Sequence, residues 1–303
     1  MSDDGRRGLT LILMIGSVFS PFYRKAISRG KGDPEKHAAV NLALYNLASP
    51  GGSWLGPAIG RKTGDLWALT EGARVSRETS ILIIGGTRAE WRDGQLHVDL
   101  CEETAPFASP LRGELVVRPN APMNEVHDLD PAGRHRWSPI APFGRIDVRF
   151  REPGLSWSGP AYLDHNAGDE PLARGFRCWT WSRVTSSEKT TVVYDVTCRD
   201  GQERRLARSF LANGARETCA GETRTLQLPT TGWRMPRSVR TVGDASLTVA
   251  HTMEDTPFYA RSHLTGHLDG KPADGVHEVV DMDRFESRTV QAMLPYRMRK
   301  LTP

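Results

Sequence analysis

The sequence contains few cysteines and none of the common short motifs of cofactor or metal sites. Its 4 cysteines form no C-x-x-C pair, so neither a zinc ribbon nor a redox dithiol is indicated. No G-x-G-x-x-G, P-loop, H-E-x-x-H or G-x-S-x-G pattern occurs either. We therefore expect no cofactor and no metal, and we interpret the cysteines as buried free thiols of a cytoplasmic protein.

The sequence also lacks a hydrophobic run long enough to span a membrane as a helix. The apolar segment near the start, residues 9–19 after Arg6 and Arg7, falls short of the ~20 apolar residues that a spanning helix needs. It has no small-x-small cleavage site of the kind that ends a secretory signal. We expect this segment to be retained, either in contact with lipid or packed on the protein.

Basic residues are not clustered. The formal net charge is +4, with 40 Lys and Arg against 36 Asp and Glu, and the arginines are spread along the whole chain. Nucleic-acid-binding proteins usually carry a basic stripe or a reader motif, so no nucleic acid is expected as a partner. The mild positive charge is consistent with solubility or with an anionic membrane surface.

Period-two alternation of apolar and polar residues dominates what is present. Ile146, Val148 and Phe150 would share one face of a strand, with charged residues between them. Asp-Gly pairs, which are typical of tight hairpin turns, occur at residues 93–94, 200–201 and 269–270. This pattern predicts an all-β fold of antiparallel strands.

Helical signals are few, and the length allows two β-units. Residues 33–37 predict a short helical turn followed by a strand, and the Gly- and Pro-rich residues 46–64 indicate a long loop suited to a lid. A chain of 303 residues fits one large β-domain or two of about 150 residues each. Because hairpins flank the middle of the chain, we expect two tandem β-domains, residues 1–155 and 156–303.

Acids, imidazoles and aromatic rings concentrate in the middle of the chain. On an extended strand, Tyr162 and Asp164 point to the same side, which would place a phenol beside a carboxyl. We expect His165 and Asn166 to point away from this pair. The simpler alternative is a polar turn in which Asp164 pairs with the arginine at position 174 or 177.

Three segments carry a resemblance to a known family. They are residues 15–21 (IGSVFSP), 133–142 (GRHRWSPIAP) and 157–171 (WSGPAYLDHNAGDEP). These motifs are long and specific, and they resemble those of the carotenoid 1,2-hydratases, also called hydroxyneurosporene synthases. The resemblance covers the chain from residue 15 to at least residue 195.

The resemblance implies an enzyme of carotenoid synthesis in phototrophic bacteria. It implies a cofactor-independent carbon–oxygen lyase that adds water across the terminal carbon 1,2 double bond of an acyclic carotene, such as neurosporene or lycopene. It also implies two tandem lipocalin-like β-barrels in a cytoplasmic protein that is peripherally associated with the intracytoplasmic membrane, where the carotene is dissolved. The sequence gives no indication of the oligomeric state.

The family's functional positions fall on four residues of this chain, with an aspartate as proton donor: Asp164, His135, Trp137 and Tyr162. Three further tryptophans either line the substrate site or pack in the core: Trp157, Trp179 and Trp181.

These residue types suit the hydration of an alkene. An isolated alkene is a weak base, and burial of Asp164 in apolar surroundings would keep this carboxyl protonated near neutral pH. Aromatic faces, here Trp137 and Tyr162, attract a cation by ~0.5–2 kcal/mol each when water is excluded. Capture of water needs a base, and His135 and the carboxylate left on Asp164 both fit that role.

Two other functions remain open on the sequence. A non-catalytic lipocalin-like carrier of hydrophobic ligands would use the same apolar interior without needing the acid. A related enzyme could act on another polyene or terpenoid, because a shared fold does not fix function.

Overall fold

Antiparallel strands dominate the structure, a computed structural model that describes residues 1–48, 65–72, 75–217, 219 and 223–300. The all-β fold predicted from alternation is confirmed. Most of the predicted lid loop, residues 49–64, lies outside the described residues. No helix in the described part of the chain is long and apolar enough to cross a membrane.

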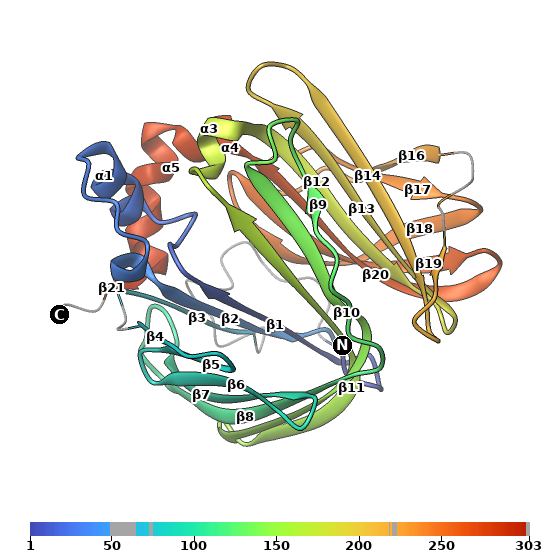
Figure 1. Cartoon of the computed structure of the whole chain (residues 1–303), viewed down its shortest axis with the longest axis horizontal. Coiled ribbons are helices and arrows are strands. Elements are labelled where there is room, and N and C mark those ends of the chain that lie inside the picture. The colour runs from blue at the N-terminus through green and yellow to red at the C-terminus, as the bar shows by residue number, and fades with distance from the viewer. Residues whose placement is uncertain (49–64, 73–74, 218, 220–222, 301–303) are drawn as a thin grey trace.

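The first half of the chain, together with the C-terminal strand β21, forms two sheets that pack against each other (Figure 1). The smaller sheet has the order β1 (Arg7–Met14), β2 (Ala39–Asn46), β3 (Leu66–Glu71) and β21 (Arg299–Lys300). The larger sheet has the order β11 (Leu155–Gly168), β10 (His135–Glu152), β8 (Pro110–Pro119), β7 (Gln95–Glu103), β6 (Thr87–Arg92), β5 (Ile81–Ile84) and β4 (Val75–Arg77), with β9 (His127–Asp128) also paired to β10.

The second half forms another large antiparallel sheet and a two-stranded ribbon. The order of the large sheet is β15 (Arg216–Glu217), β14 (Glu203–Leu211), β13 (Lys189–Cys198), β12 (Phe176–Thr185), β20 (Lys271–Asp281), β19 (Tyr259–Leu268) and β18 (Ala245–Asp255). The ribbon pairs β16 (Thr223–Leu228) with β17 (Arg237–Val242). The helical segments are short: α1 (Pro21–Ser28), η1 (Glu35–His37), α3 (Leu172–Gly175), α4 (Met282–Glu286), α5 (Arg288–Met293) and η2 (Leu294–Arg297).

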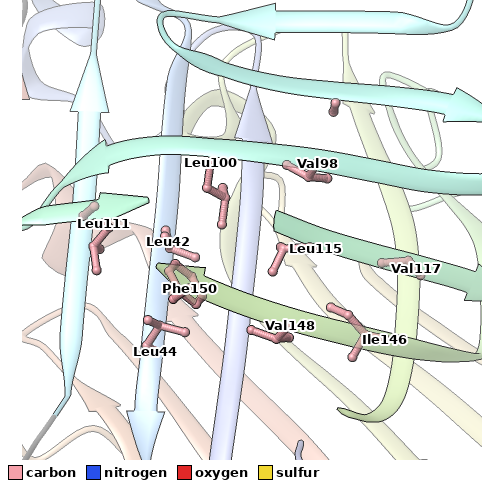
Figure 2. Close-up of a cluster of buried hydrophobic side chains, with 12 residues drawn as sticks. Leu42, Leu44, Val98, Leu100, Leu111, Leu115, Val117, Ile146, Val148 and Phe150 are labelled. Carbon is pink, nitrogen blue, oxygen red and sulfur yellow. The ribbon is translucent and has the colours of Figure 1, made fainter. Parts of the chain in front are cut away.

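One apolar core fills the space between the two N-terminal sheets. Figure 2 shows Leu42 and Leu44 of the smaller sheet facing side chains of the larger sheet, among them Val148 and Phe150 of β10. Ile146, Val148 and Phe150 are all buried, as the alternation predicts, while Asp147 is partly exposed and Arg149 is exposed. The alternating pattern therefore fixes which face of β10 turns inward.

The three predicted hairpin turns are confirmed. Asp93 and Gly94 join β6 to β7 with φ values of 51° and 72°, and Asp269 and Gly270 join β19 to β20 with φ values of 51° and 76°. These are two-residue turns in which both residues take positive φ. At the third site only Gly201 takes positive φ, because a longer connection joins β13 to β14.

The apolar segment at residues 9–19 packs on the protein. Most of it is β1, which pairs with β2 and packs Leu9, Leu11 and Leu13 against the N-terminal cores. Phe19 contacts the Trp179 ring of the second half. Residues 33–37 form the expected helical turn before a strand, since η1 precedes β2.

The β10–β11 hairpin connects the two halves. The end of β10 pairs with β8 in the N-terminal sheet, whereas the start of β10 lies against the C-terminal sheet, where Trp137 joins the core of Phe176, Trp181 and Tyr194. Figure 1 shows this long green hairpin running between the two parts. Residue 155 begins β11, which pairs with β10 along most of its length. The division of the chain near residue 155 stays a prediction.

Truncation of a core side chain on β10 should be far more costly than truncation of its neighbour. Phe150→Ala is expected to lower the free energy of unfolding by about 3–5 kcal/mol, because it leaves a cavity in the N-terminal core. Arg149→Ala, on the exposed face, should change it by less than about 0.5 kcal/mol. Urea unfolding of both variants tests this, and equal losses would contradict the assigned faces.

Candidate active site

Asp164 is held on one oxygen and free on the other. It lies on β11 opposite Pro139 of β10. Its Oδ2 atom accepts hydrogen bonds from the indole N–H of Trp137 at 2.9 Å and from the hydroxyl of Tyr162 at 3.0 Å. Oδ1 has no hydrogen-bond partner among the described residues. This arrangement orients the carboxyl group and leaves Oδ1 available to carry a proton.

Burial raises the pKa of Asp164 to about 6. The two hydrogen bonds from Trp137 and Tyr162 oppose this change because they favour the carboxylate, and the negative charge of Glu278 adds to it. The side chain is nevertheless only partly screened from solvent. The environment therefore makes Asp164 a weaker acid than an ordinary aspartate, while an approaching molecule can still reach it.

The prediction that Tyr162 and Asp164 point to the same side of a strand is confirmed. Tyr162 and Asp164 share a face, and His165 is exposed on the other. The expected direction of Asn166 is wrong: alternate residues share a face, so Asn166 lies on the side of Asp164, where its Oδ1 accepts the Tyr194 hydroxyl at 3.0 Å. The alternative ion pair of Asp164 with a nearby arginine is also wrong, because its hydrogen-bond partners are aromatic residues.

Trp137 acts through its N–H group. Its side chain is fully buried, at 0% exposure, with His127 stacked at 5.3 Å and Tyr194 at 5.7 Å between ring centroids. Its ring faces are covered by these neighbours. Trp137 is therefore positioned to hold Asp164 and has no open face for a ligand.

His135 lies apart from the carboxyl group. Its Nδ1 is 3.1 Å from the Asp130 carboxylate, and its ring packs on Phe176 at 4.4 Å between centroids. A Cβ on Gly175 would lie 2.5 Å from the imidazole Cε1, so the ring is tightly enclosed. The structure brings Trp137, Tyr162 and Asp164 together, and His135 anchors the start of the strand that carries Trp137.

Of the three further tryptophans, Trp181 belongs to the cluster around Asp164. Its ring lies 5.7 Å from that of Tyr162, and its buried indole N–H has no hydrogen-bond partner among the described residues. Trp179 instead packs on Phe19 and Phe176. Trp157 lies near the beginning of β11 and packs against the N-terminal core.

A cavity of about 190 Å³ opens beside Trp157 in the N-terminal half. Leu44, Leu66 and Leu155 contribute its apolar lining, and Tyr45 forms part of its wall. The Tyr45 hydroxyl donates to Glu254 at 2.6 Å. Among the described residues, no group of three or more His, Cys, Asp or Glu side chains is arranged to hold a metal ion.

Three residues around Asp164 were not predicted from the sequence: Tyr194, Arg183 and Glu278. In the C-terminal sheet, Trp181 stands directly opposite Tyr194 on one side and Glu278 on the other. The guanidinium of Arg183 lies over the Tyr162 ring, 5.0 Å from its centroid. The strand around Tyr194 could be predicted, but the pairing of β12 with β20, about a hundred residues apart in the chain, leaves no local signal.

A solved structure shares this fold. A structure from Nitrosomonas europaea that carries the name AttH superposes with a TM-score of 0.55 at 13% identity, covering 92% of this chain and 88% of that one. This similarity supports the lipocalin-like assignment of the fold.

Sequence relatives carry a common name. A protein of Thiocapsa roseopersicina named acyclic carotenoid 1,2-hydratase is 43% identical over 99% of this chain and 71% of its own length. A protein of the same name from Rubrivivax gelatinosus is 41% identical over 98% of this chain and 71% of its own. A third protein of this name, from Cereibacter sphaeroides, is 32% identical over 95% of this chain and 97% of its own length. The family model of the carotenoid hydratase CrtC matches residues 11–302, and the chain belongs to this family.

Proposed function

We propose that this protein is an acyclic carotenoid 1,2-hydratase, a lyase that adds water across the terminal carbon 1,2 double bond of an acyclic carotene such as lycopene or neurosporene. The observation that supports this most is the Asp164 carboxyl, with its pKa raised to about 6, one oxygen held and the other free among aromatic rings. The names of the relatives point to the same reaction.

The first step is protonation of carbon 2 by Asp164. The proton on Oδ1 passes to the alkene, the carbon 1,2 π bond breaks, and a tertiary cation forms at carbon 1. A raised pKa keeps part of the population protonated near neutral pH, and the fixed Oδ2 leaves the proton on the free oxygen. Trp137 and Tyr162 then hydrogen-bond the carboxylate that remains.

The second step is stabilisation of the cation by aromatic rings. Tyr162 bonds to Asp164, Trp181 packs on Tyr162, and an aromatic face contributes ~0.5–2 kcal/mol to a cation where water is excluded. Trp137 contributes through its hydrogen bond instead, because its ring is covered. His135, in this proposal, positions Trp137 through the start of β10.

The rest of the polyene needs apolar surroundings. The cavity beside Trp157 is partly apolar, through Leu44, Leu66 and Leu155, and at about 190 Å³ it would receive only part of a long chain. The reaction needs only a proton and water, which is consistent with independence from a cofactor. Because the substrate is dissolved in lipid, the proposal includes a cytoplasmic protein in peripheral contact with a membrane.

Asp164→Asn should abolish hydration and leave carotene binding intact. Asparagine keeps an oxygen for the Trp137 and Tyr162 bonds but cannot donate an acidic proton, so we expect a fall in turnover of about 10²–10⁴-fold. The matched control is Asp169→Asn, an exposed aspartate nearby that pairs with Arg136. Alcohol formation from lycopene and pigment retention in mixed micelles measure the two effects; full activity of Asp164→Asn would refute the proposal.

Hydration should decline as pH rises through about 6. The active form of free enzyme carries protonated Asp164, and the raised pKa places the loss of that proton near pH 6. Above this point kcat/KM is expected to fall about tenfold per pH unit. A pH profile with no decline up to pH 8 would contradict this assignment.

Removal of the Trp137 donor should move that decline to higher pH. The indole hydrogen bond favours the carboxylate and so lowers the pKa of Asp164, which means that Trp137→Phe should raise this pKa. We expect lower maximal activity, and we expect the alkaline limb of the kcat/KM profile to move to higher pH. The comparison is the wild-type profile in the same buffers, and a limb displaced downward would contradict the role given to Trp137.

A further inference from the structure

Capture of the cation requires a group that removes a proton from water. Neither Trp137 nor Tyr162 can do so, since both donate hydrogen bonds to Asp164. His135 is enclosed by Gly175 and Phe176 and bonded to Asp130. Two candidates then remain: the carboxylate left on Asp164, and a residue that the C-terminal sheet presents to the same space.

Glu278 has the required position. It lies on β20 directly opposite Trp181 on β12, and side chains at directly opposed positions share a face with Cβ atoms ~4.5–5.5 Å apart. Trp181 contacts Tyr162, which binds Asp164. Glu278 is also close enough for its negative charge to raise the pKa of Asp164. The two carboxyl groups thus approach the same aromatic cluster from different sheets.

Glu278 is held as Asp164 is held, on one oxygen. Its Oε1 accepts from Nε of Arg261 at 2.8 Å, and its Oε2 has no hydrogen-bond partner among the described residues. The side chain is 22% exposed, so water reaches it. The Arg261 guanidinium is itself fixed by Glu254 and by the Tyr45 hydroxyl, both at 2.8 Å. An ion pair with a fixed guanidinium orients the carboxylate and leaves Oε2 to bind water.

We propose that Glu278 is the base of the hydration: its free oxygen accepts a proton from the water that attacks the carbon 1 cation. This proposal rests on the proposed function. Asp164 forms the carbon 2–hydrogen bond; the water oxygen then bonds to carbon 1 while one of its O–H bonds breaks, and that proton moves to Glu278. Glu278 afterwards releases a proton to solvent and Asp164 takes one up. Trp181 stands opposite Glu278, and its indole N–H has no hydrogen-bond partner among the described residues. In this proposal that N–H is the donor that holds the water.

Deuterium labelling separates the two steps. In D₂O, Asp164 delivers deuterium to carbon 2. When water is not captured, the cation loses a proton from carbon 2 or from a methyl group on carbon 1, and deuterium accumulates in the recovered carotene and its double-bond isomers. The measurements are alcohol formation and the mass of recovered lycopene, with the full chain and lycopene in mixed micelles.

Glu278→Gln should form alcohol about 10²–10⁴-fold more slowly than wild type while deuterium still enters the recovered lycopene. Glu278→Asp should recover part of the alcohol formation. The matched control is Glu203→Gln, which removes an exposed carboxylate of the same sheet, paired with Arg205 on β14, and should stay within about threefold of wild type.

Three results would overturn the role of Glu278: undiminished alcohol formation by Glu278→Gln, loss of deuterium incorporation together with alcohol, or an equal defect in Glu203→Gln. Asp164→Asn tests the proposed function separately, because it should show neither alcohol nor deuterium. Activity in Asp164→Asn would refute the acid step and leave the result for Glu278 to be judged on its own.

Discussion

The candidate site depends on one carboxyl group being kept in surroundings that disfavour its charge. Asp164 belongs to a strand of the N-terminal sheet, but the β10–β11 hairpin is long enough to carry it against the C-terminal sheet. There Trp137 is covered completely and Asp164 loses part of its hydration, which raises its pKa to about 6.

The two halves of the chain complete each other at this place. A row of directly opposed residues crosses the C-terminal sheet from Tyr194 through Trp181 and Glu278 to Arg261. Tyr45 reaches Arg261 from β2 of the N-terminal sheet. A buried ion pair costs desolvation energy and contributes little net stability when it is complete, but it fixes geometry. The row therefore serves to orient the site more than to hold the halves together.

Local patterns predicted much of this molecule, and long-range pairing hid the rest. Alternation fixed the inward face of β10 at Val148 and placed Tyr162 beside Asp164, because both follow from strand geometry alone. Asp-Gly pairs gave the turns for the same reason. Glu278 could not be foreseen, since its place opposite Trp181 depends on which strands pair, and a strand's own sequence does not name its partner. The covered ring of Trp137 likewise depends on its neighbours in space.

Asp164 also makes the folded protein less stable as pH rises. Its pKa is about 6 in the folded chain, against 3.8 for an aspartate in water, so the folded chain binds the proton more tightly than the unfolded chain does. Stability is lost between these two values as pH increases, and above about pH 6 the folded state carries a charge that its surroundings disfavour. Tight packing elsewhere, such as the N-terminal core around Phe150, offsets this cost. A carboxyl group that stays protonated near neutral pH is therefore kept at the expense of stability.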